Sequence, residues 1–120
     1  MSVTPLNQAK YDLTVKVESG NVLIECEGDY DFETIPNLRQ KLKECVPDKF
    51  NKIVVDLSRV EFLDSTGVGL FASLLKKAHE NDKKLVFVGA RGQPRAVLDI
   101  IGFDDLVEYY ETQSDALLSL

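Results

Sequence analysis

The segment from Asp64 to Gly69 carries the residues best suited to chemistry, in the order Asp-Ser-Thr-Gly-Val-Gly. Its two hydroxyl groups, on Ser65 and Thr66, stand at the predicted start of a helix. There the first N–H groups lack intrahelical partners and the macrodipole is positive. The hydroxyl of Ser65 can cap this helix, and a phosphate on Ser65 is also well placed, because helix N-termini favour anions. The residues alone therefore leave a cap and a phosphorylation site open.

Gly67 and Gly69 lie in the first turns of the same predicted helix. A glycine inside a helix costs about 1 kcal/mol relative to alanine. We expect the close approach of another backbone, or of a partner, to compensate for that cost.

Catalysis by Ser65 is not expected. The only histidine, His79, lies about four turns further along the same predicted helix, roughly 20 Å away at 1.5 Å per residue. No Ser–His pair can therefore form within one chain. Residues 67–72 match the G-x-G-x-x-A fingerprint of dinucleotide sites, but they do not directly follow a predicted strand. The sequence predicts neither an enzyme nor a bound cofactor.

A metal site has little support. Four aspartates could gather at one end of a sheet, where their oxygens would suit a hard cation, but no histidine supports them. We therefore expect no metal. These residues are Asp29, Asp31, Asp56 and Asp64.

The elements that must position Ser65 begin with two alternating stretches. Residues 11–17 and 22–27 predict an antiparallel hairpin. A helix follows from Ile35, with Thr34 as its expected N-cap and an end at Pro47. The β-branched run at 53–57 predicts a central strand covered on both faces, followed by a short connection at 59–63.

The second half of the chain alternates between helix and strand. The helix that starts at Ser65 is expected to stop at Asn81, and residues 85–88 predict a second buried strand. A loop at 89–94 leads to a short helix ended by Gly102. An edge strand at 106–110 and a last helix capped by Ser114 complete the pattern.

This order predicts an α/β fold with a mixed, mostly parallel sheet, an N-terminal antiparallel hairpin and helices packed against the sheet. Residues 1–9 are expected to be a loose N-terminus and residues 10–120 one domain.

The composition excludes several classes of function. The 120 residues carry a net charge of −6, which disfavours nucleic acid and anionic membranes as direct partners. We expect no signal peptide, because the first residues lack its basic and apolar regions, and no apolar run reaches the ~20 residues that span a bilayer. Cys26 and Cys45 are expected to pack as small hydrophobic residues. The sequence therefore predicts a cytoplasmic protein without membrane insertion.

Three segments in order resemble bacterial anti-sigma-factor antagonists of the STAS-domain type. They are residues 28–31, residues 55–69 and the tail from Leu85 to Leu118. The specific part is the aspartate–serine–serine/threonine–glycine motif at residues 64–67, which follows a strand and opens a helix. The resemblance spans roughly residues 10–118 and implies the STAS fold.

The resemblance also implies partner switching that regulates transcription. A serine kinase, itself the anti-sigma factor, would bind the unmodified protein and phosphorylate Ser65, with Thr66 as the second choice, and a serine phosphatase would reverse the step. Two departures from the family pattern, Tyr30 at a position that is often aliphatic and Phe32-Glu33 in place of smaller residues, could adjust which kinase is recognised. An accessory subunit of a larger assembly such as a transporter, or a regulator with a non-sigma output, is the alternative. The expected partner surface comprises Gly28, Asp29, Tyr30, Asp31, Asp64, Thr66, Gly67 and Val68.

Overall fold

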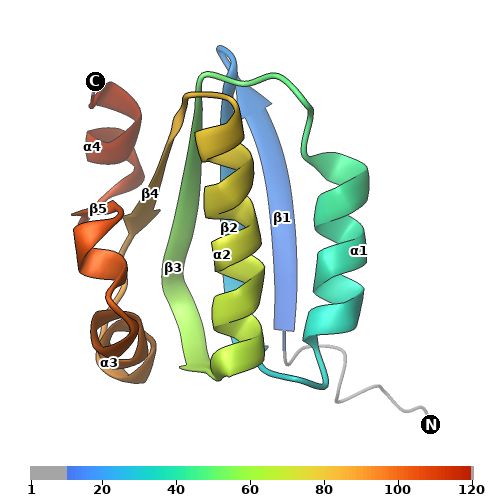
Figure 1. Ribbon diagram of the computed structural model, residues 1–120, viewed down its shortest axis with the longest axis vertical. Helices are drawn as coiled ribbons and strands as arrows, with labels where there is room; N and C mark the ends of the chain where they lie inside the picture. Colours follow the sequence, from blue (N-terminus) through green and yellow to red (C-terminus); the bar gives the residue numbers. More distant parts are fainter. Residues whose placement is uncertain (1–10, 120) are drawn as a thin grey trace, which may run out of the picture.

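The computed structural model describes residues 11–119, so the expected loose N-terminus at residues 1–9 lies outside the described residues. Helices and strands alternate along the chain as predicted (Figure 1). The elements are β1 (Tyr11–Glu18), β2 (Asn21–Tyr30), α1 (Ile35–Cys45), β3 (Lys52–Leu63), α2 (Ser65–Glu80), β4 (Lys84–Val88), α3 (Gly92–Ile101), a short 3-10 helix (Phe103–Asp105), β5 (Glu108–Tyr110) and α4 (Gln113–Leu118).

The five strands form one sheet in the order β1-β2-β3-β4-β5. Strand β1 runs antiparallel to β2, and the remaining neighbours are parallel. The hairpin between β1 and β2 closes through Ser19 and Gly20, both with positive φ, as the two-residue turns that match strand twist require. The predicted mixed sheet with an antiparallel edge is confirmed.

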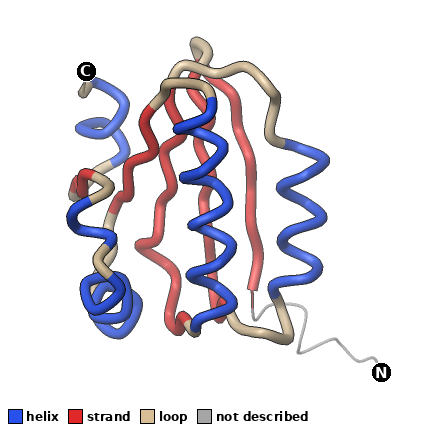
Figure 2. Tube along the Cα trace, in the orientation of Figure 1, coloured by secondary structure: helices blue, strands red, loops and turns tan. Residues whose placement is uncertain are grey.

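The two faces of the sheet are covered unequally. Helices α1 and α2 lie side by side over one face, where alternate strand residues form the main core with them (Figures 1 and 2). Helix α4 lies over the other face. There Ala116 packs on the strand residues that point away from α1 and α2, such as Val54 and Val86. The central strand covered on both faces, predicted from the apolar run at 53–57, is confirmed.

Strand β3 is longer than predicted, because the expected connection at 59–63 continues the strand to Leu63. Its register against β2 shifts between Glu25 and Glu27 and again between Gly28 and Asp29. At each shift, successive side chains no longer point to opposite faces of the sheet in a regular alternation. The apolar–polar alternation that predicts a strand is therefore missing from residues 59–63, although they still pair with β2. The extension places Leu63 beside the first residues of α2.

Several predicted element ends are corrected by the structure. Helix α3 begins at Gly92 rather than near Val97. Helix α4 is capped by Thr112, whose hydroxyl accepts from the N–H of Asp115 at 3.1 Å, and not by Ser114. Gly102 ends α3 in the left-handed conformation (φ 95°), as predicted.

The two cysteines differ. Cys26 is buried as predicted, and burial raises the pKa of its thiol to about 12. Cys45 is exposed, which corrects the prediction that it packs in the core. It is the last residue of α1, beyond the stripe of Ile35, Leu38 and Leu42 that this helix buries.

Candidate functional site

Ser65 is the first residue of α2 and its side chain is exposed. The cap of this helix is the preceding residue, Asp64, whose backbone is extended. Its Oδ1 accepts hydrogen bonds from the N–H groups of Thr66 (2.8 Å) and Gly67 (3.0 Å). A capping role for Ser65 is therefore wrong, because Asp64 already satisfies the orphan N–H groups. Among the described residues, none hydrogen-bonds to the Ser65 hydroxyl.

Asp64 also joins α2 to the loop of residues 31–34, which we call the β2–α1 loop. Its Oδ2 accepts from the N–H of Phe32 at 3.0 Å, and its own N–H donates to the carbonyl of Tyr30 at 3.2 Å. One aspartate thus caps the helix and ties it to a segment more than thirty residues earlier in the chain. The loop and Ser65 are held in one fixed arrangement.

Gly67 brings α2 close to the end of β2. A Cβ at this position would lie 2.5 Å from the backbone carbonyl oxygen of Tyr30 and would also overlap the side chain of Leu63. No residue with a side chain fits there without moving the backbone. The expected close approach is confirmed for Gly67. At Gly69 no other part of the described chain approaches, because a Cβ there would meet nothing within 4 Å.

The β2–α1 loop is organised by its own polar side chains. One carboxylate oxygen of Asp31 accepts from the N–H groups of Glu33 (2.9 Å) and Thr34 (3.1 Å). The Thr34 hydroxyl accepts from the N–H of Asp31 at 3.1 Å and donates to the carbonyl of Asp29 at 2.8 Å. Thr34 occupies the N-cap position of α1 but makes no side-chain cap bond to that helix, which corrects its predicted role. It stabilises the loop instead.

Tyr30 belongs to the core, not to the partner surface on which it was placed. Its side chain is 0% exposed and stacks on Phe71, with ring centroids 5.8 Å apart. Burial raises the pKa of the phenol, which stays neutral and donates to the carbonyl of Asp12 at 2.7 Å. In the predicted partner surface, Gly28, Gly67 and Val68 are buried as well.

The exposed part of this end is made by other residues. Asp29, Asp31, Asp64 and Thr66 are half-buried, and Ser65 is exposed. Phe32 and Glu33, which were not placed in the predicted surface, are exposed between them. Residues 28–38 and 60–72, which frame Ser65, contain acidic residues but no lysine or arginine. These two segments are therefore acidic.

Gln93, in the first turn of α3, was not predicted to have any role at the site. Its side-chain oxygen accepts from the N–H of Leu63 at 2.9 Å, and its amide nitrogen donates to the carbonyl of Leu63 at 2.8 Å. The side-chain amide thus makes the same pair of hydrogen bonds to the backbone of Leu63 that a neighbouring strand would make. It does so where β4 no longer pairs with β3, since the last paired residues are Asp56 and Val88. A contact across thirty residues leaves no local pattern, so sequence reasoning could not have found it.

The four aspartates that could have gathered do not form one cluster. Asp56 takes part in a different network on the sheet, in which its carboxylate accepts from Ser58 (2.7 Å) and Gln113 (2.6 Å). The described residues contain no group of three or more histidine, cysteine or acidic side chains arranged to hold a metal ion. Within residues 11–119, no helix is long and apolar enough to cross a membrane.

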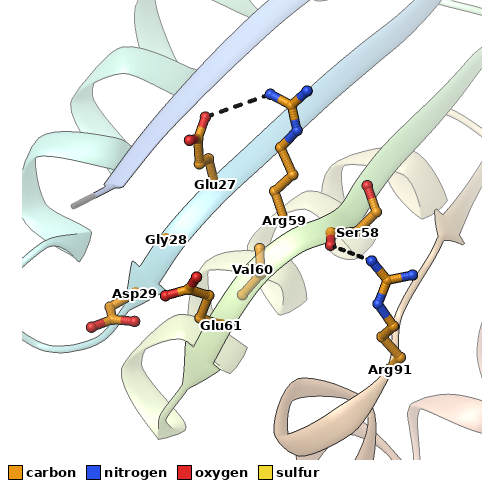
Figure 3. Close-up of a pocket in the computed structure, with 8 residues that line it drawn as sticks. All are labelled: Glu27, Gly28, Asp29, Ser58, Arg59, Val60, Glu61 and Arg91. Atoms are coloured by element: carbon orange, nitrogen blue, oxygen red, sulfur yellow. Dashed lines mark hydrogen bonds and ion pairs between the residues drawn. The ribbon is translucent and has the colours of Figure 1, made fainter. Parts of the chain in front are cut away.

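A hollow of about 680 Å³ lies over the ends of β2 and β3 (Figure 3). Its two arginines are already engaged: Arg59 lies 3.8 Å from Glu27, and Arg91 donates to the carbonyl of Ser58 at 3.1 Å. Asp29 and Glu61 line the rest, and Ser65 does not line it. The candidate site is therefore the exposed surface around Ser65 and not a pocket.

Comparison with known proteins agrees with this description. The STAS domain model matches residues 12–116. The anti-sigma-B factor antagonist of Staphylococcus aureus (strain NCTC 8325 / PS 47) is 34% identical over 88 residues, which cover 73% of this chain and 82% of the relative. A crystal structure of an anti-sigma factor antagonist from Mycobacterium paratuberculosis superposes with a TM-score of 0.77 and 31% identity, covering 89% of this chain and 91% of that one.

The fold also matches SpoIIAA, a Bacillus cell fate determinant solved in its phosphorylated form, with a TM-score of 0.68 and 20% identity over 89% of this chain and 96% of that one. The fold, the helix-opening motif and these matches define a STAS domain. The chain belongs to the family of STAS-domain anti-sigma-factor antagonists. These relatives bear the name of a regulatory protein, and no enzyme family is indicated.

Proposed function

We propose that this protein binds an anti-sigma-factor serine kinase and is switched off by reversible phosphorylation of Ser65. The observation that supports this most is the Ser65 hydroxyl, which is exposed and free of hydrogen bonds to the described residues at the start of α2. Asp64 performs the capping, so the hydroxyl is available to another protein's active site. A serine phosphatase would restore the unmodified form. This role requires ATP and puts the protein in the cytoplasm.

Ser65 is favoured over Thr66 by accessibility. The Thr66 residue is half-buried and its N–H is held by Asp64, whereas Ser65 is exposed one position earlier. A kinase must surround the hydroxyl that it modifies, and the more exposed residue costs less rearrangement. Thr66 remains the second choice.

A phosphate on Ser65 would add about −1.5 to −2 charges at pH 7 next to Asp64. The two segments that frame Ser65 contain no lysine or arginine to pair with it, and Asp64 already accepts from two N–H groups of the first turn. With no basic residue in these two segments to pair with it, the phosphate has little means of refolding the loop. We therefore expect it to act at the interface, where it must be desolvated and repels the nucleotide phosphates of the kinase.

The test is phosphate transfer from ATP by a purified anti-sigma-factor kinase from the same organism. The wild type should gain one phosphate by mass, Ser65→Ala should gain none, and Thr66→Ala should be modified like the wild type. Binding of Ser65→Ala to the kinase should persist, while the phosphorylated protein should bind at least about 100-fold more weakly, which corresponds to a few kcal/mol. Transfer to Ser65→Ala would refute the site assignment.

The alternative arrangement, an accessory subunit of a larger assembly, predicts a different result. In that case the protein would co-purify with membrane components, and Ser65→Asp would not release it. The same substitution should abolish kinase binding under our proposal. The pair of measurements separates the two functions.

A further inference from the structure

Phe32 is a large apolar side chain near the proposed phosphorylation site, and it is 70% exposed. It lies in the β2–α1 loop, and its N–H is bonded to the carboxylate of Asp64, the residue that precedes Ser65. Because most of its surface stays in water, the side chain of Phe32 contributes little hydrophobic stabilisation to the folded protein. Its presence here requires another explanation.

The backbone that carries Phe32 is fixed. Asp31 bonds to the two residues that follow Phe32, and Asp64 holds Phe32 itself. A rigid aromatic side chain loses little conformational freedom on binding, because it has only two rotatable bonds. Side chains of this kind form the energetic centres of protein interfaces when they enter a pocket of the partner.

The surroundings of Phe32 are acidic. Glu33 is exposed, and Asp29, Asp31 and Asp64 are half-buried. Residues 28–38 and 60–72 contain no lysine, arginine or histidine. An apolar projection bordered by carboxylates is complementary to an apolar pocket bordered by lysine and arginine side chains.

We propose that Phe32 is the anchor by which the partner kinase recognises this antagonist, and that the kinase receives it in an apolar pocket bordered by basic residues. This inference rests on the function proposed above. In this proposal, Phe32 supplies most of the affinity for the kinase. The carboxylates around it, which we call the acidic border, speed association. The phosphate on Ser65 differs from these border charges because it would lie inside the interface, where it must lose its water, while the border stays solvated.

The test uses the purified kinase that phosphorylates the wild-type chain. Truncation by Phe32→Ala should weaken binding about thirtyfold, as for a residue at the centre of an interface. In phosphate transfer, KM should rise by a similar factor while kcat at saturating antagonist is unchanged. The melting temperature should match the wild type, because Phe32 is exposed. Phe32→Tyr should restore most of the affinity.

Leu118→Ala is the matched control, since Leu118 is 82% exposed and is the last residue of α4, a helix at the opposite end of the molecule from the start of α2 (Figure 1). Its affinity should stay within about twofold of the wild type. Raising the salt concentration should slow association of the wild type and of Phe32→Ala alike, while faster dissociation should belong to Phe32→Ala only.

Equal affinities for Phe32→Ala and Leu118→Ala would overturn the anchor while leaving the proposed function intact. A fall in kcat with an unchanged KM would overturn it too, because the side chain would then serve the transfer step and not recognition. A wild type that no anti-sigma-factor kinase binds or modifies would refute the proposed function, and the anchor with it.

Discussion

Helices α2 and α3 start near the same end of the sheet, but their first turns are held in different ways. In α2, Asp64 caps two N–H groups and Gly67 lies against the carbonyl of Tyr30. In α3, Arg91 occupies the cap position without any side-chain cap bond and extends its guanidinium to Ser58 instead. The first turn of α3 is attached through Gln93 to Leu63.

This difference explains why the hydroxyl of Ser65 can be left without a hydrogen bond to the described residues. The start of α2 is fixed by the residue before Ser65 and by a glycine after it, so the serine hydroxyl is not needed for stability. The start of α3 is held instead by long-range side-chain bonds, from Gln93 to Leu63 and from Arg91 to Ser58. The following predictions test this comparison, in order of decreasing effect.

Replacing Gly67 by alanine should have the largest effect. The new methyl group would overlap the carbonyl oxygen of Tyr30, so α2 must move away from β2. Overpacking against backbone should lower the free energy of unfolding by about 3 kcal/mol. Urea denaturation followed by circular dichroism measures this loss. A loss below about 1 kcal/mol would show that α2 moves away from β2 at little cost.

Replacing Asp64 by alanine should rank second. It removes the cap of α2 and leaves the N–H of Phe32 without its acceptor, at a cost of about 2 kcal/mol. Asp64→Asn is the matched control, since its amide oxygen can still cap α2, while its NH2 group cannot accept from the N–H of Phe32. It should lose about 1 kcal/mol, less than Asp64→Ala. Equal losses in the two variants, measured by urea denaturation, would mean that the bond to Phe32 and the charge matter more than the cap.

Replacing Gln93 by alanine should cost about 1 kcal/mol, the net value of the paired bonds to Leu63. The effect should be local, because Asp64 holds α2 independently. Hydrogen exchange of the Leu63 amide should therefore accelerate more than exchange in the α2 core. Uniform acceleration across α2 would contradict the independence of the two helix starts.

Replacing Gly69 by alanine should have the smallest effect and the opposite sign. The position is helical and a Cβ there meets nothing within 4 Å, so helix propensity alone should stabilise the protein by about 0.5–1 kcal/mol. A rise in the midpoint of urea unfolding checks this. Because Gly67 and Gly69 differ only in surroundings, the sign difference between the two alanine variants isolates the contact with Tyr30.

Much of the fold could be predicted because its signals are local. Alternation over residues 11–17, the β-branched run at 53–57 and the glycine at 102 each act within a few residues, and each produced the element expected. The length of β3 could not be predicted in this way. Its last residues pair with β2 across register shifts, which remove the alternation on which strand prediction depends.

The sequence by itself determined the motif, the start of α2 at Ser65 and the acidic character of the segments around it, because these depend on residue types and short spacings. Only the tertiary structure decided that Asp64 rather than Ser65 caps the helix, that Tyr30 is buried and that Phe32 is presented beside Ser65. The physical reason is that Asp64 has two carboxylate oxygens. One bonds to its own helix, and the other bonds to a loop that only folding brings near.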